Sequence, residues 1–165
     1  MPWSGHPDSI RAMRFFLCLF VLSCHLHAAG ERDIAGKVVA VHDGDTLTVL
    51  TAEKREEKIR LEGIDAPELK QAFGAKAKAR LAALVFGKPV VIHATGKDRY
   101  QRTLGRVIVN GKDINLQMVK DGFAWHYAAY SKDAALRKAQ TEAQAAKRGL
   151  WSDASPVPPW EFRKR

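Results

Sequence analysis

Five short stretches typical of β-strands, interrupted by one helical stretch, constrain the fold of this chain most. The strand-like stretches are residues 37–41, 47–50, 58–64, 89–94 and 103–109. Between the third and the fourth, residues 69–86 place apolar side chains at helical spacing. Short strands with one crossing helix favour a small Greek-key barrel of the OB type, a mainly β fold with added helices. An α+β sandwich built from the same elements is the alternative.

Turn and capping residues support this division of the chain. An Asp-Gly pair at 43–44 and an Asn-Gly pair at 110–111 are hairpin signals. Asp113 is expected to cap a short helix, and residues 131–148 form an Ala-rich helical stretch. The proline-rich, basic tail, residues 154–165, is expected to be extended.

The N-terminal residues differ from the rest of the chain. Two arginines precede a ten-residue apolar run at 15–24, and small residues follow it. This order is typical of a secretory signal peptide, and the run is too short for a bilayer span, which needs about 20 residues. We therefore interpret residues 1–28 as a signal peptide and expect a secreted or periplasmic protein. Alternatives are a start at Met13, lipid attachment at Cys24, or a buried or disordered arm.

Composition narrows the partners and the means of stabilisation. Lys and Arg number 27 against 18 Asp and Glu, a net charge of +9. Such a surplus attracts nucleic acid, anionic lipid or acidic polymers. Both cysteines, Cys18 and Cys24, lie in the N-terminal stretch, so the body of the chain offers neither a disulfide framework nor a cysteine zinc site.

Two acidic clusters lie where a strand-like stretch meets a turn. Asp43 and Asp45 form one, and Asp65 and Glu68 form the other. Each cluster alone is ordinary turn chemistry, but carboxylates from adjacent strands make a hard-cation site, because Ca²⁺ and Mg²⁺ prefer oxygen ligands. Glu68, just past a proline turn, is placed to act as a general base on a metal-held water. The Arg60 side chain is expected on the side of its strand that faces this site. The alternative is that Arg60 is an ordinary surface residue of the strand.

A second group of candidates lies in the basic loop at residues 98–102. Arg102 is suited to bidentate phosphate binding, and Tyr100 to stacking on a base. A solvated loop is the alternative. The aromatic residues at 123–130 are expected in the core, except Tyr130, which is the best candidate among them for a nucleotide contact.

These residues resemble the thermonuclease, or staphylococcal nuclease-like, family of secreted Ca²⁺-dependent nucleases. The matching stretches are HDGDTLTV (42–49), IRLEGIDAPE (59–68), KDRYQRTLGRV (97–107), GFAWHY (122–127) and RGLW (148–151). The resemblance implies a five-stranded OB-fold barrel with three helices, in a nuclease domain at 29–153 that is followed by the tail at 154–165. It also implies hydrolysis of DNA and RNA to 3′-phosphate ends, without a stable protein partner, by a monomer.

The resemblance also assigns roles around the cation. It implies that Asp45 and Asp65 bind Ca²⁺ through their carboxylates, that Ala66 binds it through its backbone carbonyl, and that Asp43 supports these ligands from behind. Glu68 would be the general base. Position 66 carries Ala where well-known members have Thr, which preserves a carbonyl ligand but removes a hydroxyl contact.

The phosphate and nucleotide contacts follow from the same resemblance. It implies that Arg60 and Arg102 clamp the phosphate, and that Tyr100 and Tyr130 contact the nucleotide. Gln101 replaces a glycine common in the family, which puts the path of the loop and the direction of Arg102 in question. A less favoured substitute clamp is the arginine four residues beyond Arg102.

Two rival functions belong to other classes. A non-catalytic OB module would bind nucleic acid only, but binding-only relatives lose residues such as Arg60, Glu68 and Arg102, which are all present here. A basic protein acting on membranes or cell-wall polymer would leave Asp45 and Asp65 without a role.

Overall fold

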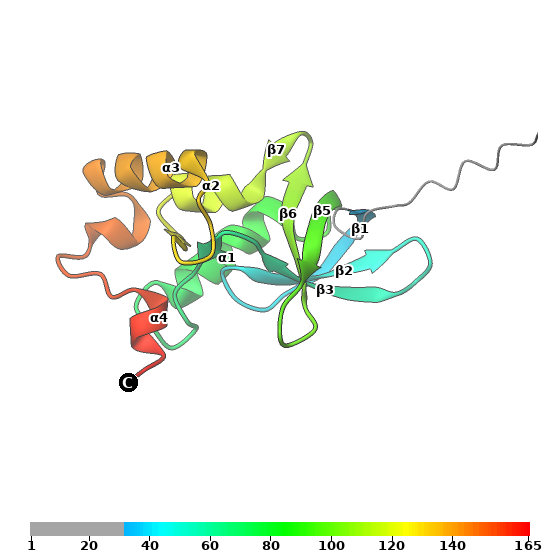
Figure 1. Cartoon of the computed structure of the whole chain (residues 1–165), viewed down its shortest axis with the longest axis horizontal. Helices are drawn as coiled ribbons and strands as arrows, with labels where there is room; N and C mark the ends of the chain where they lie inside the picture. The colour runs from blue at the N-terminus through cyan, green and yellow to red at the C-terminus, as the bar shows by residue number, and fades with distance from the viewer. Residues whose placement is uncertain (1–31) are drawn as a thin grey trace, which may run out of the picture.

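The structure is a computed structural model, and it describes residues 32–165 (Figure 1). The predicted signal peptide at 1–28, with its alternatives at Met13 and Cys24, lies outside the described residues. Within residues 32–165, no helix is long and apolar enough to cross a membrane.

Five strands form a closed barrel. They are β1 (Arg32–Val41), β2 (Thr46–Thr51), β3 (Glu56–Leu61), β5 (Pro89–Lys97) and β6 (Thr103–Val109). Their order is β3-β2-β1-β5-β6, and β3 also pairs in parallel with β6, which closes the sheet on itself. A register shift between Val38 and Ala40 marks a bulge in β1, the strand that pairs with both β2 and β5. The predicted OB-type barrel is thereby confirmed over the α+β sandwich.

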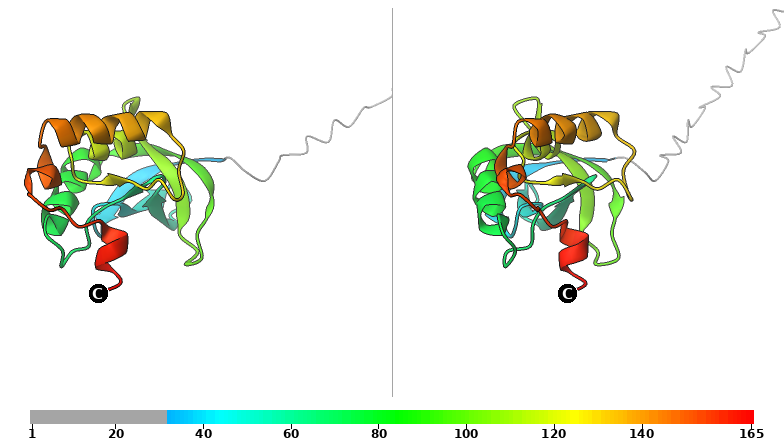
Figure 2. Two further views of the ribbon diagram at one scale, coloured as in Figure 1. Left: turned by 60° about the vertical axis from the view of Figure 1, so that its left-hand side comes forward. Right: turned by 90° about the vertical axis from the view of Figure 1, so that its left-hand side faces the viewer.

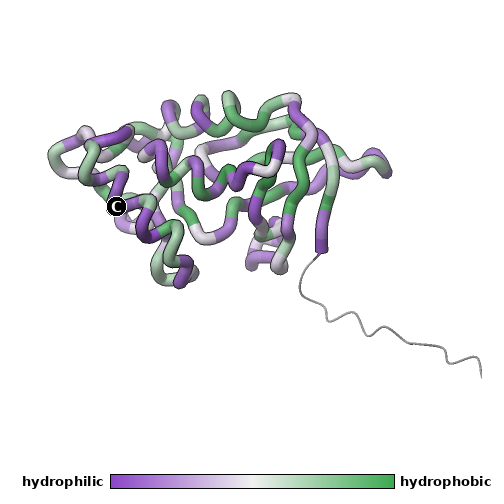
Figure 3. Tube along the Cα trace, turned by 90° about the horizontal axis from the view of Figure 1, so that it is seen from above, coloured by the Kyte–Doolittle hydropathy of each residue, from purple (hydrophilic) through white to green (hydrophobic). Residues whose placement is uncertain are grey.

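The barrel is filled by the apolar residues of the alternating stretches. In β6, Thr103, Gly105, Val107 and Val109 are buried and the residues between them are partly exposed. Figure 3 shows the same alternation of hydrophobic and hydrophilic segments along the chain. The largest fully buried side chains include Leu47 and several others of the barrel strands: Ile59, Leu61, Ile92 and Val107. This interior makes the barrel a rigid base for the loops at its ends.

The third predicted strand is shorter than expected. Residues 58–64 were expected to alternate as one strand, with Ile64 on the face opposite Leu61. Instead β3 ends at Leu61, and Ile64 begins β4 (Ile64–Asp65), which pairs with β8 (Trp125–His126). Gly63, with φ of 75°, makes the turn that resets the alternation, so Ile64 is buried as well. This turn places Asp65 at the mouth of the barrel.

Three helices lie together at one side of the barrel, as predicted (Figures 1 and 2). They are α1 (Gly74–Val85), α2 (Ile114–Lys120) and α3 (Ala134–Ala145). The Asp113 side chain, at the end of β7 (Lys112–Asp113), accepts a hydrogen bond from the Leu116 N–H at the start of α2, as expected of an N-cap. Helix α1 starts later than the expected residue 69, because Phe73 adopts a left-handed φ of 66°.

The C-terminal segment is ordered against the barrel, contrary to the expected extended tail. After η1 (Gly149–Ser152), the chain runs back to one helical turn, α4 (Pro159–Phe162). Pro159 lies at the first helical position, where its fixed φ favours a helix start. The Trp160 ring stacks on Tyr127 with centroids 5.2 Å apart, and the Gln71 side-chain amide donates to the Val157 carbonyl at 2.6 Å. These contacts bring α4 beside the mouth of the barrel (Figure 2).

Candidate active site

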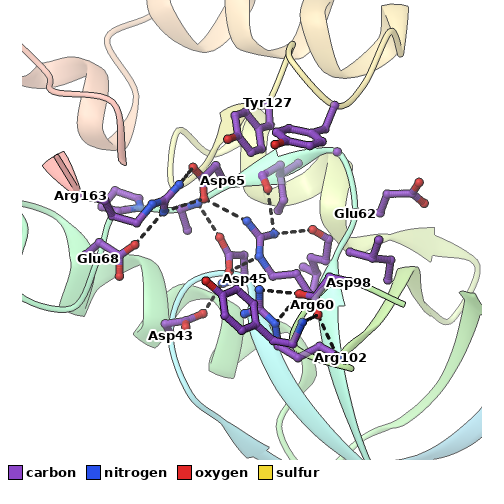
Figure 4. Close-up of a pocket in the computed structure, with 18 of the residues that line it drawn as sticks. Asp43, Asp45, Arg60, Glu62, Asp65, Glu68, Asp98, Arg102, Tyr127 and Arg163 are labelled. Atoms are coloured by element: carbon purple, nitrogen blue, oxygen red, sulfur yellow. Dashed lines mark hydrogen bonds and ion pairs between the residues drawn. The ribbon is translucent and has the colours of Figure 1, made fainter. Parts of the chain in front are cut away.

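One cavity of about 620 Å³ lies at the mouth of the barrel, with the loops at 98–102 and 126–131 on its rim (Figure 4). All the residues to which the sequence assigned a role line this cavity: Asp43, Asp45, Arg60, Asp65, Ala66, Glu68, Tyr100, Arg102 and Tyr130. They come from the β1–β2 turn, from β3 and β4 with the loop that follows, and from the rim loops. The fold therefore gathers side chains that are far apart in the sequence.

Asp45 is a buried carboxylate held rigidly in the turn before β2. It is 6 % exposed, and its Oδ2 accepts a hydrogen bond from the Ala66 N–H at 2.7 Å. Its own N–H donates to Asp43 Oδ1 at 2.9 Å. Burial raises the pKa of Asp45 to about 7, against the lowering effect of Arg60, and the charges of Asp43 and Asp65 raise it further. Burial therefore disfavours the charged form of the Asp45 carboxyl.

Arg60 joins the two acidic clusters. Its Nε lies 3.1 Å from Asp45 Oδ1, and its Nη2 donates to Asp65 Oδ1 at 2.9 Å. Its Nη1 donates to the carbonyls of Leu61 at 2.6 Å and Ile64 at 2.8 Å. The guanidinium thus pins the turn between β3 and β4, and one N–H of Nη2 is used by none of the hydrogen bonds found among residues 32–165.

The chemistry of the carboxylates fits a hard cation. Asp45 and Asp65 supply anionic oxygens and Ala66 a neighbouring backbone carbonyl, which are the ligand types that Ca²⁺ takes. Burial is the main cause of the raised pKa of Asp45, and a cation bound beside it would favour the charged form of the carboxylate. In the part of the chain that the structure describes, no group of three or more His, Cys, Asp or Glu side chains is close enough to hold a metal. Such a cation would therefore rest on two carboxylates and the carbonyl.

Glu68 and Asp65 share a partner that the sequence reasoning missed. The Nη1 of Arg163, directly after α4, donates to Glu68 Oε1 at 2.7 Å, and its Nη2 donates to Asp65 Oδ2 at 2.7 Å (Figure 4). The hydrogen bond from Arg163 to Asp65 is the main cause that raises the pKa of the arginine. The only signal for Arg163 in the sequence was the basic character of the tail.

The loop at 98–102 directs Arg102 into the cavity. Asp98 Oδ2 accepts from the Arg102 Nε at 2.7 Å and lies 2.7 Å from its Nη2, and Asp98 Oδ1 accepts from the Tyr100 N–H at 2.8 Å. Although burial alone would raise it, these hydrogen bonds lower the pKa of Asp98. Gln101 takes a left-handed φ of 62°, so it holds a conformation that favours glycine. Gln101 therefore occupies a backbone conformation that glycine adopts at lower cost, and Arg102 follows it on the cavity side of the loop.

Arg106 is engaged elsewhere. Its Nη1 donates to Asp113 Oδ2 at 3.0 Å and its Nη2 pairs with Asp133, the residues that cap α2 and α3. It is not among the residues that line the cavity. The substitute clamp considered from the sequence has a structural role instead.

Aromatic rings form part of the cavity rim. Tyr100 is 63 % exposed, with the Arg102 guanidinium carbon 5.4 Å from the centre of its ring. Tyr130 is 77 % exposed, and its ring centroid lies 4.7 Å from that of Tyr127. Tyr127 was expected in the core, but it is half-buried and lines the cavity, because β8 turns it toward Asp65 rather than into the barrel.

Comparison with known proteins places this chain in a family. The family model described as "Staphylococcal nuclease homologue" matches residues 58–153. An uncharacterized endonuclease of Haemophilus influenzae is 46 % identical over 147 residues, which cover 89 % of this chain and 83 % of the relative. An uncharacterized endonuclease of Escherichia coli O157:H7 is 46 % identical over 150 residues, 90 % of this chain and 95 % of the relative.

A plant protein is similar over a shorter stretch. The staphylococcal-like nuclease CAN1 of Arabidopsis thaliana is 44 % identical over 107 residues, 65 % of this chain and 33 % of the relative. The family model covers more than half of the chain, and the bacterial relatives match it nearly end to end. The chain belongs to the family of staphylococcal nuclease homologues, and it is a nuclease, a hydrolase of phosphodiester bonds.

Proposed function

We propose that this protein is an exported, Ca²⁺-dependent nuclease that cleaves both DNA and RNA and leaves 3′-phosphate ends. The single observation that carries the proposal is the convergence of Asp45, Asp65, Glu68, Arg60 and Arg102 on one cavity. The strongly basic composition adds attraction for a polyanionic substrate.

The cation would be held by Asp45, Asp65 and the Ala66 carbonyl. When bound, Ca²⁺ supplies Lewis-acid stabilisation of the charge on the phosphoryl oxygens and makes water easier to deprotonate. Asp43 supports this arrangement by fixing the turn, since its Oδ1 accepts from the Asp45 N–H. The raised pKa of Asp45 accords with a buried carboxylate whose negative charge a bound cation would stabilise.

Glu68 is the proposed general base. It lies on the loop after β4, partly exposed at the cavity, where its carboxylate accepts the proton of the water that attacks phosphorus. Attack in line breaks the bond to the 5′ oxygen, which leaves as the alcohol after it takes up a proton. The phosphate stays on the 3′ oxygen of the other fragment.

The two arginines offset the charge that builds on the phosphoryl oxygens. Arg60 has one N–H of Nη2 to offer, because its other donors face Asp45, Asp65 and two carbonyls. Arg102 lies on the neighbouring loop before β6, and its Nη1 lies 3.5 Å from the hydroxyl of Thr46, the residue that pairs with Arg60 across β2 and β3. A phosphate oxygen can replace this weak contact. Tyr100 and Tyr130 are exposed rings on which bases stack.

Incubation of the purified full chain with plasmid DNA and with RNA tests this function. Both should be cut with Ca²⁺ present, cutting should stop with chelator, and Asp45→Ala should abolish it. End-labelling should find 3′-phosphate ends. Full cleavage in chelator would contradict the Ca²⁺ proposal, and tight binding without cleavage would favour a binding-only OB module.

The export part of the proposal has its own test. Sequencing of the protein recovered outside the cytoplasm should find an N-terminus between about residues 27 and 31, as expected for a cleaved signal peptide. Recovery with Met1 or Met13 intact would contradict cleavage, and a lipid on Cys24 would favour the lipoprotein alternative.

A further inference from the structure

The guanidinium of Arg163 occupies the space between the general base and a cation ligand. Its Nη1 donates to Glu68 Oε1 at 2.7 Å, and its Nη2 to Asp65 Oδ2 at 2.7 Å, while Nη1 also lies 3.3 Å from Asp65 Oδ1 (Figure 4). Arg60 donates to the same Oδ1 at 2.9 Å. Both oxygens of the Asp65 carboxylate are therefore in contact with positive charge.

This pairing competes with cation binding. A Ca²⁺ ligand oxygen lies about 2.3–2.6 Å from the ion, so an ion on Asp65 would meet the Arg163 guanidinium at short range. Two positive charges at that distance repel strongly in a partly buried site. Asp65 is 1 % exposed, and solvent screens this repulsion little. Ion binding through Asp65 and the Arg163 pair are alternatives at one carboxylate.

The element that carries Arg163 is suited to moving away. Helix α4 has four residues, too few to be stable alone, so its position depends on its contacts with the barrel. They include the Trp160–Tyr127 stack at 5.2 Å, the edge-on contact of Trp160 with Trp125 at 5.6 Å, the Gln71 hydrogen bond to the Val157 carbonyl, and buried Pro159. The Arg163 side chain itself is 42 % exposed, so it reaches solvent without disturbing the barrel.

We infer that residues 156–165 form a latch that keeps the site inactive until a divalent cation displaces Arg163. The inference rests on the proposed cation site. In the closed state Arg163 holds Asp65 and Glu68 with a built-in positive charge. In the open state both carboxylates are free, one for the cation and one for the attacking water. The latch thereby sets the cation concentration at which the nuclease becomes active.

Calorimetric titration of the full chain with Ca²⁺, in the absence of nucleic acid, tests the latch. Arg163→Gln should bind Ca²⁺ about 5–150-fold more tightly than the wild type, the range typical of coupled equilibria. Lys164→Gln is the matched control, because it removes the same charge from the same segment but no side-chain contact to the site, and its affinity should match the wild type. Trp160→Ala loosens the anchor on Tyr127 and should also tighten Ca²⁺ binding.

The outcomes separate this inference from the proposed function. Equal affinity, or weaker binding, in Arg163→Gln would overturn the latch, while wild-type binding that Asp45→Ala abolishes would leave the proposed cation site standing. If neither the wild type nor Arg163→Gln binds Ca²⁺ at millimolar concentrations, the proposed cation site fails and the latch fails with it. Far-ultraviolet circular dichroism of each variant establishes that the fold is retained.

Discussion

Replacing Arg60 with alanine should destabilise the fold as strongly as it impairs catalysis. The Arg60 side chain is 13 % exposed, and the side chains of its partners Asp45 and Asp65 are 8 % and 2 % exposed. The same guanidinium holds the Leu61 and Ile64 carbonyls, which shape the turn between β3 and β4. Arg60 is therefore a structural centre of the site as well as a proposed contact to phosphate.

The magnitude follows from what the substitution leaves behind. Removal of one partner of a buried ion pair costs about 3–5 kcal/mol, and here Asp45 loses its arginine while Asp65 keeps its contacts with Arg163. Each buried carbonyl that loses its donor adds about 1–3 kcal/mol where water does not replace it. Water reaches part of this cavity and can replace the lost donors, so we expect a total loss in stability near the cost of the ion pair alone, about 3–5 kcal/mol.

Urea unfolding in the presence of chelator measures this loss. Arg55→Ala is the control, because that side chain is 71 % exposed and forms a surface ion pair with Glu53 at 3.8 Å. This variant should lose less than about 1 kcal/mol of stability. If Arg60→Ala unfolds within about 1 kcal/mol of the wild type, the structural role argued here is wrong. Because Arg60→Ala is expected to be less stable, its activity should be measured only at temperatures where the variant is folded.

Three further predictions address the turn, the loop and the helix start around the cavity. Burial raises the pKa of Asp45 to about 7, so its contribution to the stability of the folded protein without metal should be lost as pH rises from about 4 to 7. In chelator, the difference in Tm by which Asp45→Asn exceeds the wild type should therefore grow over that pH range. Gln101→Gly should raise the free energy of unfolding by roughly 0.5–1 kcal/mol in urea, because it relieves the left-handed φ of 62°. A Cβ on Gly74 would lie 1.9 Å from the Glu68 carbonyl oxygen, whereas one on Gly96 meets nothing within 4 Å. Gly74→Ala should therefore lower kcat by displacing Glu68, and Gly96→Ala should leave kcat unchanged. A Tm difference for Asp45→Asn that does not change with pH, a Gln101→Gly variant no more stable than the wild type, or an unchanged kcat in Gly74→Ala would contradict the corresponding prediction.

The barrel could be predicted from local signals, because its strands follow a simple alternation. Strand β6 was predicted with its bounds, and Asp113 caps α2 as expected from its position before an apolar stretch. Each of these features depends on residues close in sequence. The assigned site residues gather in one cavity although they are far apart in the sequence, because the barrel brings together the turns and loops that carry them.

The features that could not be predicted depend on contacts between distant residues. Ile64 was placed on the wrong face, because the turn at Gly63 resets the alternation and β4 then pairs with β8, far along the chain. Arg163 reaches Asp65 because contacts such as the stack of Trp160 on Tyr127 hold α4 there, and no local pattern in the tail indicates them.

The single-turnover rate of Glu68→Gln in saturating Ca²⁺ tests the central claim most directly. Glutamine keeps the shape of the side chain but does not accept the proton, so cleavage should slow by about 10²–10⁴-fold while affinity for nucleic acid stays nearly the same. Glu142→Gln, an exposed acid-to-amide change on α3 away from the cavity, is the matched control and should cleave at the wild-type rate. If Glu68→Gln cleaves as fast as the wild type, Glu68 is not the base, and the account of this site is contradicted.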